Sequence, residues 1–372
     1  MRIAIVHYWL VSMRGGERVL EALCEMFPEA DIFTHVVDRA AISPTIAQHT
    51  IHTSFIQKLP AARRLYRHYL PLMPMALELL DLSAYDLVIS SEAGPAKGVI
   101  TRPDAVHICY CHSPMRYLWD QHAVYRRAAG PIQRLAMAAF SPRLRLWDAM
   151  TALRVDSFVA NSAFVAQRIR RYYGCGSVTI HPPVRIDTFE PTGKSGGDYL
   201  CLGQIVPYKR IDLVIEAFRT LDRRLIIAGD GGADQARLAA RAPDNVTFLG
   251  RQSEDAVRAL LGACRALILP GEEDFGIVPV EAMASGRPVI AYGVGGARAT
   301  VIDGKTGLFF AEQTTASLRD AIVRFEAMEH RFDAGAIRAH AERFDTAHFK
   351  RAFRAHVDDC LDAARDRVAR AA

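Results

Sequence analysis

The chain has 372 residues, of which 50% are hydrophobic and 23% are charged. This length favours two domains, and the composition excludes an intrinsically disordered chain. The formal net charge of +5 suits an anionic ligand or an anionic membrane surface. No long basic tract or aromatic RNA-binding motif indicates a nucleic-acid partner.

The chain begins directly on an apolar run and shows no signal-peptide features. No apolar run reaches the roughly 18 residues that a membrane-spanning helix needs. The seven cysteines are scattered, except Cys109 and Cys111, which would point the same way from one strand. A metal pair is one interpretation, but buried small hydrophobes are favoured because no second ligand pair lies nearby. The pattern indicates reduced thiols in a cytoplasmic protein.

Short apolar runs recur along the chain and predict strands buried in parallel sheets. They lie at Ile3–His7, Asp86–Ser90, Ala105–Cys111, Ser157–Ala160, Tyr199–Gly203, Arg224–Gly229, Asn245–Gly250, Ala266–Pro270, Pro288–Tyr292 and Gly307–Phe310. Helical patterns alternate with these runs, at Arg18–Met26, Arg210–Leu221, Ser253–Ala263 and Val280–Ser285. The alternation predicts an α/β protein.

A break rich in Pro, Gly and Ser spans Ile186–Asp198, and a new strand begins directly after it. We therefore expect an N-terminal Rossmann-like domain at 1–186 and a C-terminal Rossmann-like domain at 187–345. The tail at 346–372 is helical in pattern and rich in Ala and Arg.

Two stretches, Gln57–Leu80 and Tyr125–Met150, interrupt the α/β rhythm and mix basic residues with apolar and aromatic ones. One interpretation is a pair of helices lying on an anionic membrane surface, which would make the protein peripheral on the inner face of the cytoplasmic membrane. The other is a pair of ordinary amphipathic helices with a solvated basic face. The sequence leaves both open.

Two loops that follow predicted strands carry ligand-binding signals. Gly15 and Gly16 open a helix, where backbone N–H groups can bind an anion, although tight turns also use glycine for geometry alone. Lys209 stands at a strand-to-helix junction, where its ammonium can reach a diphosphate. The alternative for Lys209 is a solvated side chain, but a cation at a helix start is mildly unfavourable.

The most informative stretch runs from Leu269 to Pro288. A helix is expected to start near Val278, so that the N–H groups of Gly276, Ile277 and Val278 lack partners inside it. Glu273 in the loop suits sugar hydroxyls, and Glu281 in the helix suits a ribose diol. Charges favoured at a helix start would explain Glu281, but they do not explain three consecutive acidic residues in the loop.

The pair Glu273 and Glu281 resembles the Glu-x7-Glu motif of the retaining family-four glycosyltransferases. Further matching segments stand in the family's order: Gly15–Arg18, Tyr110–Tyr117, Val159–Ser162, Lys209–Phe218, Ala228–Gly232, Asn245–Gly250 and Asp303–Leu308. The resemblance covers nearly the whole chain. It implies the GT-B fold, with two Rossmann-like domains facing across a cleft and a C-terminal helix that crosses back to the first domain.

The resemblance also implies roles for individual residues. Lys209 would bind the donor diphosphate, and Glu273 would hold the donor sugar. Glu281 would bind the ribose, and His112 would lie at the reacting sugar. The remaining donor contacts would come from Gly15 and Gly16 at the phosphate, from the backbone of Phe275, Gly276, Ile277 and Val278 at the sugar, and from Val246 and Arg251 at the nucleotide base.

One position departs from the family pattern. Gln204 stands where the family usually has an arginine, so one cation that would stabilise the diphosphate is missing. Arg210 replaces a common glycine. We hypothesise that Arg210 supplies the missing charge.

The implied reaction is hexosyl transfer from a nucleotide sugar in bacterial polysaccharide synthesis. The resemblance to mannosyltransferases favours GDP-mannose, followed by a UDP-sugar, with a glycan or a polyprenyl-diphosphate-linked glycan as acceptor. No Asp-x-Asp pair or His-rich cluster occurs, so no metal or other cofactor is expected. A sugar-nucleotide epimerase or hydrolase and a catalytically silent nucleotide-sugar-binding protein remain as alternatives.

Overall fold

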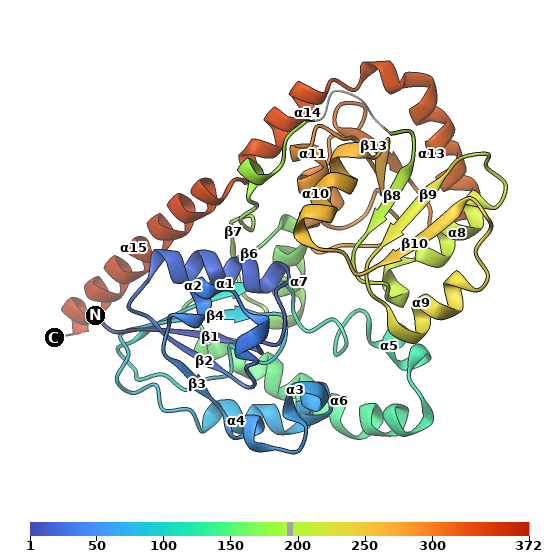
Figure 1. Cartoon of the computed structure of the whole chain (residues 1–372). Coiled ribbons are helices and arrows are strands. Elements are labelled where there is room, and N and C mark those ends of the chain that lie inside the picture. The colour runs from blue at the N-terminus through green and yellow to red at the C-terminus, as the bar shows by residue number, and fades with distance from the viewer. Residues whose placement is uncertain (192–195, 372) are drawn as a thin grey trace. The chain divides into compact units, whose positions relative to one another are not determined.

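The computed structural model describes residues 1–191 and 196–371 (Figure 1). The chain forms two compact units, one from Met1–Pro183 with Ala347–Ala372 and the other from Val184–Thr346. These bounds lie within three residues of the domain limits expected from the sequence. Residues 192–195, which belong to the expected linker, lie outside the described residues.

The first unit is built on a seven-stranded parallel sheet in the order β3-β2-β1-β4-β5-β6-β7. Its strands are β1 (Ile3–His7), β2 (Asp31–Thr34), β3 (Ile51–Thr53), β4 (Leu87–Glu92), β5 (Val106–Cys111), β6 (Ser157–Ala160) and β7 (Val178–Thr179). The chain builds the sheet in one direction from β1 to β3 and then returns to add β4 on the other side of β1. Such a reversal is the switch point at which doubly wound sheets bind ligands.

Helices pack against both faces of this first sheet. The helices of the first unit are α1 (Gly15–Met26), α2 (Pro44–Ala47), α3 (Ala62–Leu65), α4 (Met73–Glu78), α5 (His122–Ala128), α6 (Pro131–Thr151), α7 (Ala163–Tyr173) and α15 (Thr346–Ala371). The tail helix α15 runs beside α1, and its Phe349, Phe353 and Val357 join the core formed by α1 and the sheet (Figure 1). The tail is therefore a structural part of the first unit.

The second unit repeats the same architecture. Its six parallel strands follow the order β10-β9-β8-β11-β12-β13, which reverses between β8 and β11. The strands are β8 (Tyr199–Leu202), β9 (Leu225–Ala228), β10 (Val246–Gly250), β11 (Ala266–Leu269), β12 (Val289–Tyr292) and β13 (Gly307–Phe310). The helices are α8 (Ile211–Phe218), α9 (Gly232–Ala239), α10 (Glu254–Ala263), α11 (Ile277–Ala284), α12 (Ala297–Thr300), α13 (Thr315–Met328) and α14 (Ala334–Ala341). Both units are thus Rossmann-like, as the sequence predicted.

Cys109 and Cys111 lie side by side on one face of β5, fully buried in a single apolar cluster with Phe158 and Val165. All seven cysteines are free thiols. Burial raises the pKa of both thiols well above the usual range. The interpretation of this pair as small buried hydrophobes is therefore confirmed.

Within the described ranges, no helix is both long and apolar enough to cross a bilayer.

Candidate active site

The switch point of the second sheet brings two of the expected donor-site residues together. Lys209 follows β8 and Glu273 follows β11, and these two strands are neighbours in the sheet. The Lys209 Nζ and Glu273 Oε1 atoms are 3.0 Å apart, and the two side chains are only 18% and 16% exposed. Because this position is partly shielded from water, the attraction between the Lys209 ammonium and a phosphate is stronger than it would be on the surface.

Glycines make this close approach of the two loops possible. A Cβ atom on Gly271 would lie 2.7 Å from the Lys209 Cα atom, and one on Gly203 would lie 3.0 Å from Lys209 Nζ. The loop after β11 is also fixed to the segment after β12, because the N–H of Gly296 donates to the carbonyl of Glu273 at 2.7 Å. Lys209 is therefore held by backbone packing on one side and by Glu273 on the other.

The helix that follows Glu273 begins where the sequence predicted. Gly276 has a φ of 89°, a left-handed conformation that glycine adopts readily, and α11 starts at the next residue, Ile277. Since Ile277 and Val278 are the first two helical residues, their N–H groups have no acceptor within the helix. The partial positive charge of this helix start lies next to the loop of Glu273, a suitable place for an anionic group. Glu281 lies one turn further along α11.

Arg210 adopts a strained backbone conformation. Its φ of 51° and ψ of 39° are left-handed, a region that non-glycine residues rarely occupy. Its guanidinium is held by Asp212, with 3.2 Å between Arg210 Nε and Asp212 Oδ1. The common glycine at this family position thus has a physical reason, and the arginine in its place carries a conformational cost.

This strain yields a prediction about stability and activity together. We expect Arg210→Gly to raise the free energy of unfolding of the second unit by about 0.5–1 kcal/mol, because the strain disappears. Arg210→Ala keeps the strained backbone and should gain nothing. If Arg210 supplies the charge missing at Gln204, both variants should lose about tenfold in turnover. Chemical denaturation and steady-state kinetics measure the two effects, and unchanged turnover in either variant would rule out the compensation.

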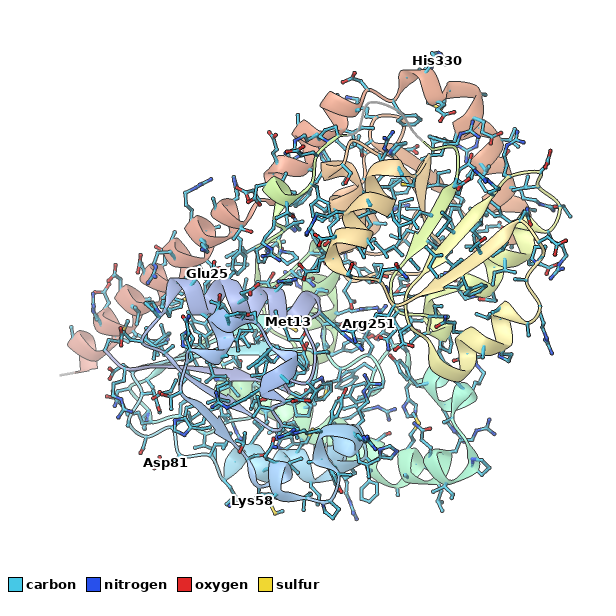
Figure 2. All side chains as sticks on the ribbon, viewed as in Figure 1. Met13, Glu25, Lys58, Asp81, Arg251 and His330 are labelled. Carbon is cyan, nitrogen blue, oxygen red and sulfur yellow. The ribbon has the colours of Figure 1, made fainter. Side chains whose placement is uncertain are left out.

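The two residues expected at the nucleotide base fall at opposite ends of β10. Arg251 follows the carboxyl end of the strand and has an exposed side chain (Figure 2). Val246 is the first residue of the strand and is buried in the apolar core. At about 3.3 Å per residue, Val246 lies more than 10 Å from the edge that carries Lys209 and Glu273. The structure therefore does not bring Val246 to the site.

In the first unit, the expected residues Gly16 and His112 come together at the carboxyl edge of the sheet. A Cβ atom on Gly16 would lie 2.3 Å from the hydroxyl of Tyr8 and 3.7 Å from His112 Nε2, so only glycine fits there. Gly15 is the first residue of α1. His112 Nε2 lies 2.9 Å from the Oγ atom of Ser91. Burial, followed by the neighbouring His7, lowers the pKa of His112 to about 3 and keeps its ring neutral.

Sequence reasoning missed the groups that support His112. His7 and Ser91 lie opposite each other on β1 and β4, and Glu17 lies in the first turn of α1. The sequence signal that could have identified His7 and Ser91 is a polar residue near the carboxyl end of an otherwise apolar strand. Among the residues that the structure describes, no cluster of three or more His, Cys, Asp or Glu side chains could hold a metal ion.

Comparisons with known proteins agree with this architecture. Residues 13–188 match the family described as "Glycosyltransferase Family 4", and residues 187–342 match "Glycosyl transferases group 1". A D-inositol 3-phosphate glycosyltransferase of Stackebrandtia nassauensis is 32% identical over 253 residues, which are 58% of this chain and 55% of that protein. An uncharacterized glycosyltransferase of Methanocaldococcus jannaschii is 36% identical over 134 residues, 34% of this chain and 38% of that protein. The chain thus spans about half the length, or less, of the curated relatives it matches.

Solved structures match over almost the whole chain. HepE of Anabaena in complex with UDP has a TM-score of 0.70 at 17% identity, covering 96% of this chain and 100% of that chain. Sucrose-phosphate synthase of Thermosynechococcus elongatus has a TM-score of 0.72 at 18% identity, covering 98% and 100%. At these identities the likeness establishes the fold. Each half of the chain thus matches a glycosyltransferase family, and the two Rossmann-like units are those of the GT-B fold.

Proposed function

We propose that this protein transfers a hexose from a nucleotide sugar to a glycan or lipid-linked glycan, with retention of anomeric configuration. The observation that carries the proposal is the Lys209–Glu273 ion pair at the switch point of the second sheet, next to the start of α11. This arrangement offers a cation and helix N–H groups to a diphosphate, and a carboxylate to sugar hydroxyls.

The chemistry requires stabilisation of a leaving diphosphate. Breaking the bond between the anomeric carbon and the phosphate oxygen builds positive charge on the sugar and negative charge on the phosphate. Lys209, Arg210 and the N–H groups at the start of α11 would meet that negative charge without a metal ion. Glu273 would orient the sugar. As the family resemblance implies, His112 would lie at the reacting sugar.

The choice of donor rests on a sequence resemblance and on the ligands of similar solved structures. The segments Tyr110–Tyr117 and Pro207–Asp212 resemble those of bacterial mannosyltransferases of polysaccharide assembly, so GDP-mannose is our first choice. A UDP-sugar is the second choice, because the HepE structures hold UDP and UDP-glucose. We propose a glycan or polyprenyl-diphosphate-linked glycan as acceptor.

Calorimetric titration with GDP and UDP in the presence of EDTA tests the donor site. We expect GDP to bind and Glu281→Ala to weaken binding about tenfold, since a ribose hydroxyl loses a charged acceptor. Glu312→Ala, at an exposed glutamate of the same unit, is the matched control and should bind as the parent does. Preferential binding of UDP would replace the donor but keep the reaction. If neither nucleotide binds, the donor site itself is refuted. In a separate activity assay, breakdown of the nucleotide sugar without any acceptor would favour a hydrolase or an epimerase.

We further propose that the first unit binds anionic membranes through α6. Burial along α6 begins only at Ser141, and Ile132 and Leu135 in its first turns are 87% and 73% exposed. Further exposed apolar side chains on or next to α6 are Phe140, Leu146, Met150 and Leu153. Arg134 and Arg143 add positive charge to the same helix. Apolar side chains interleaved with arginines suit the interface of an anionic bilayer.

Flotation with vesicles tests this membrane interaction. We expect the protein to co-float with vesicles containing anionic lipid at low salt, and to lose most of this binding in the Ile132→Asp/Leu135→Asp variant. Val323→Asp, at an exposed apolar residue of α13 in the second unit, is the matched control. Absence of flotation at low salt, or equal loss with the control, contradicts membrane binding through α6.

A further inference from the structure

A buried chain of polar side chains connects α1 to His112. It consists of Glu17, His7, Ser91 and His112, and we call it the histidine relay. Ser91 Oγ lies 3.1 Å from His7 Nδ1 and 2.9 Å from His112 Nε2. On the far side of His7, its Nε2 atom lies 3.9 Å from Glu17 Oε1. Glu17, His7 and Ser91 are all at least 98% buried, so water does not compete for these contacts.

The serine hydroxyl makes the two histidines depend on each other. A hydroxyl carries one proton, so Ser91 can donate to only one of the two ring nitrogens and must accept from the other. If Ser91 donates to His7 Nδ1, it accepts a hydrogen bond from a protonated Nε2 of His112. If it donates to His112 Nε2, the proton of His112 has to sit on Nδ1. The two arrangements therefore give His112 opposite tautomers.

Glu17 distinguishes between the two arrangements. Its Oε2 atom accepts a hydrogen bond from the backbone N–H of Arg14 at 3.0 Å, which holds the carboxylate in place at the start of α1. Its Oε1 atom faces Nε2 of His7 and attracts a proton on that nitrogen rather than a lone pair. With the proton of His7 on Nε2, its Nδ1 atom is an acceptor. Ser91 then donates to His7 and accepts from His112.

We propose that the histidine relay fixes His112 as the neutral tautomer protonated on Nε2, so that its Nδ1 atom accepts a hydrogen bond from a sugar hydroxyl. In the described part of the chain, no protein group is found in a hydrogen bond with Nδ1 of His112, which leaves its lone pair to a ligand. Asn161 donates to the backbone carbonyl of His112 at 2.8 Å and further fixes the residue. His7, Ser91 and Glu17 are positioning residues in this arrangement, and the identity of the ligand rests on the proposed function.

Nitrogen NMR of the full-length protein labelled with ¹⁵N-histidine tests the tautomer directly. We expect the His112 ring to show a protonated Nε2 and an unprotonated Nδ1, with its signals assigned by their loss in His112→Gln. Ser91→Ala removes the acceptor for Nε2–H and should give His112 a mixture of the two tautomers. Protonation of Nδ1 in the parent protein, or unchanged His112 signals in Ser91→Ala, would overturn the proposal.

The neighbouring residue on β4 provides a matched control. Ser90 Oγ lies 2.9 Å from Nε2 of His107, which is another buried serine–histidine hydrogen bond outside the histidine relay. Ser90→Ala should change the signals of His107 and leave those of His112 as they are. Glu17→Gln removes the charge with little change in shape and should weaken the preference of His112 for one tautomer. An equal response of His112 to Ser90→Ala would mean general loosening of β4 and would refute the relay.

The activity measurement separates this inference from the proposed function. With a working transfer assay, Ser91→Ala should lower kcat about tenfold while nucleotide binding to the second unit stays unchanged. The tautomer is measured without any substrate. If the protein proves not to be a transferase, the NMR experiment still tests the tautomer of His112 independently.

Discussion

Lys209→Ala is expected to lower kcat/KM for glycosyl transfer by about 10²- to 10³-fold, the usual cost of removing one preorganised group that stabilises transition-state charge. Lys209 Nζ is held 3.0 Å from Glu273 Oε1, and Gly203 and Gly271 pack closely against Lys209. The loss should appear mainly in kcat, because the phosphate gains charge as the bond to the sugar breaks. Steady-state kinetics with saturating acceptor measures it.

The control for Lys209→Ala is Lys305→Ala, which removes an exposed lysine from a surface turn of the same unit. It should change kcat/KM less than twofold. Lys209→Ala leaves Glu273 without its ion pair, so Glu273→Gln and the double variant are needed as well. Since the two residues act as one unit, the double variant should lose much less than the product of the single losses. A kcat/KM for Lys209→Ala within threefold of the parent value would refute its role at the diphosphate.

The fold was largely predictable because strand signals in a doubly wound protein are local. Runs of buried apolar residues located β1, β6 and β13 at the bounds the structure shows, and most of the others within two residues. The three strands that were missed are β2, β3 and β7, with four, three and two residues. Runs of two or three residues, as in β7 and β3, are too short for a periodic signal, and both residues of β7 are exposed. The length of β2 does not explain why it was missed, because β6 and β13 also have four residues.

The sequence predicts the candidate site only where several of its residues lie in one segment of the chain. Glu273, Gly276 and Glu281 lie within nine positions, so strand, loop and helix signals locate them together. Val246 lies away from the binding edge because the matching segment spans a whole strand and only its carboxyl end reaches that edge. His7 and Ser91 are 84 positions apart, and only the pairing of β1 with β4 brings them together. Each residue has a local signal as a polar side chain near the end of an apolar strand, but a single sequence does not show that the two pair with each other.

Lys97→Met should destabilise the first unit by about 3–5 kcal/mol, the cost of leaving buried charges without their partner. Lys97 is fully buried, with its Nζ atom 2.8 Å from Glu92 Oε1 and in contact with Asp148 Oδ1. Glu92 ends β4 and Asp148 lies on α6, so Lys97 links the sheet to that helix. Denaturant unfolding of the full chain, followed by the transition of the first unit, measures the loss.

Surface and buried ion pairs can be compared within the same unit. Lys350 Nζ lies 2.6 Å from Glu25 Oε2, but both side chains are more than 30% exposed, and Glu25 lies on the surface of α1 (Figure 2). Lys350→Met should therefore cost less than about 1 kcal/mol, because an exposed pair gains little over hydration. A similar cost for Lys97→Met would mean that the buried cation contributes no more than a surface one.

The pH dependence of Lys97→Met follows from the carboxylates it leaves behind. Burial, followed by the charge of Asp148, raises the pKa of Glu92 even in the presence of Lys97, whose charge acts in the opposite direction. Without Lys97 this pKa rises further, so the folded variant binds protons more tightly than the unfolded chain does. Its stability should therefore be highest below the unfolded pKa of about 4.3 and should fall as the pH rises through the folded pKa. The difference in stability between Lys97→Met and the parent protein should be smaller at pH 5.5 than at pH 8.

Adding Glu92→Gln and Asp148→Asn to Lys97→Met should restore much of the stability lost at pH 8, because no buried charge then lacks a partner. An equal deficit at both pH values, with no recovery in the triple variant, would show that Lys97 contributes through packing rather than through its charge.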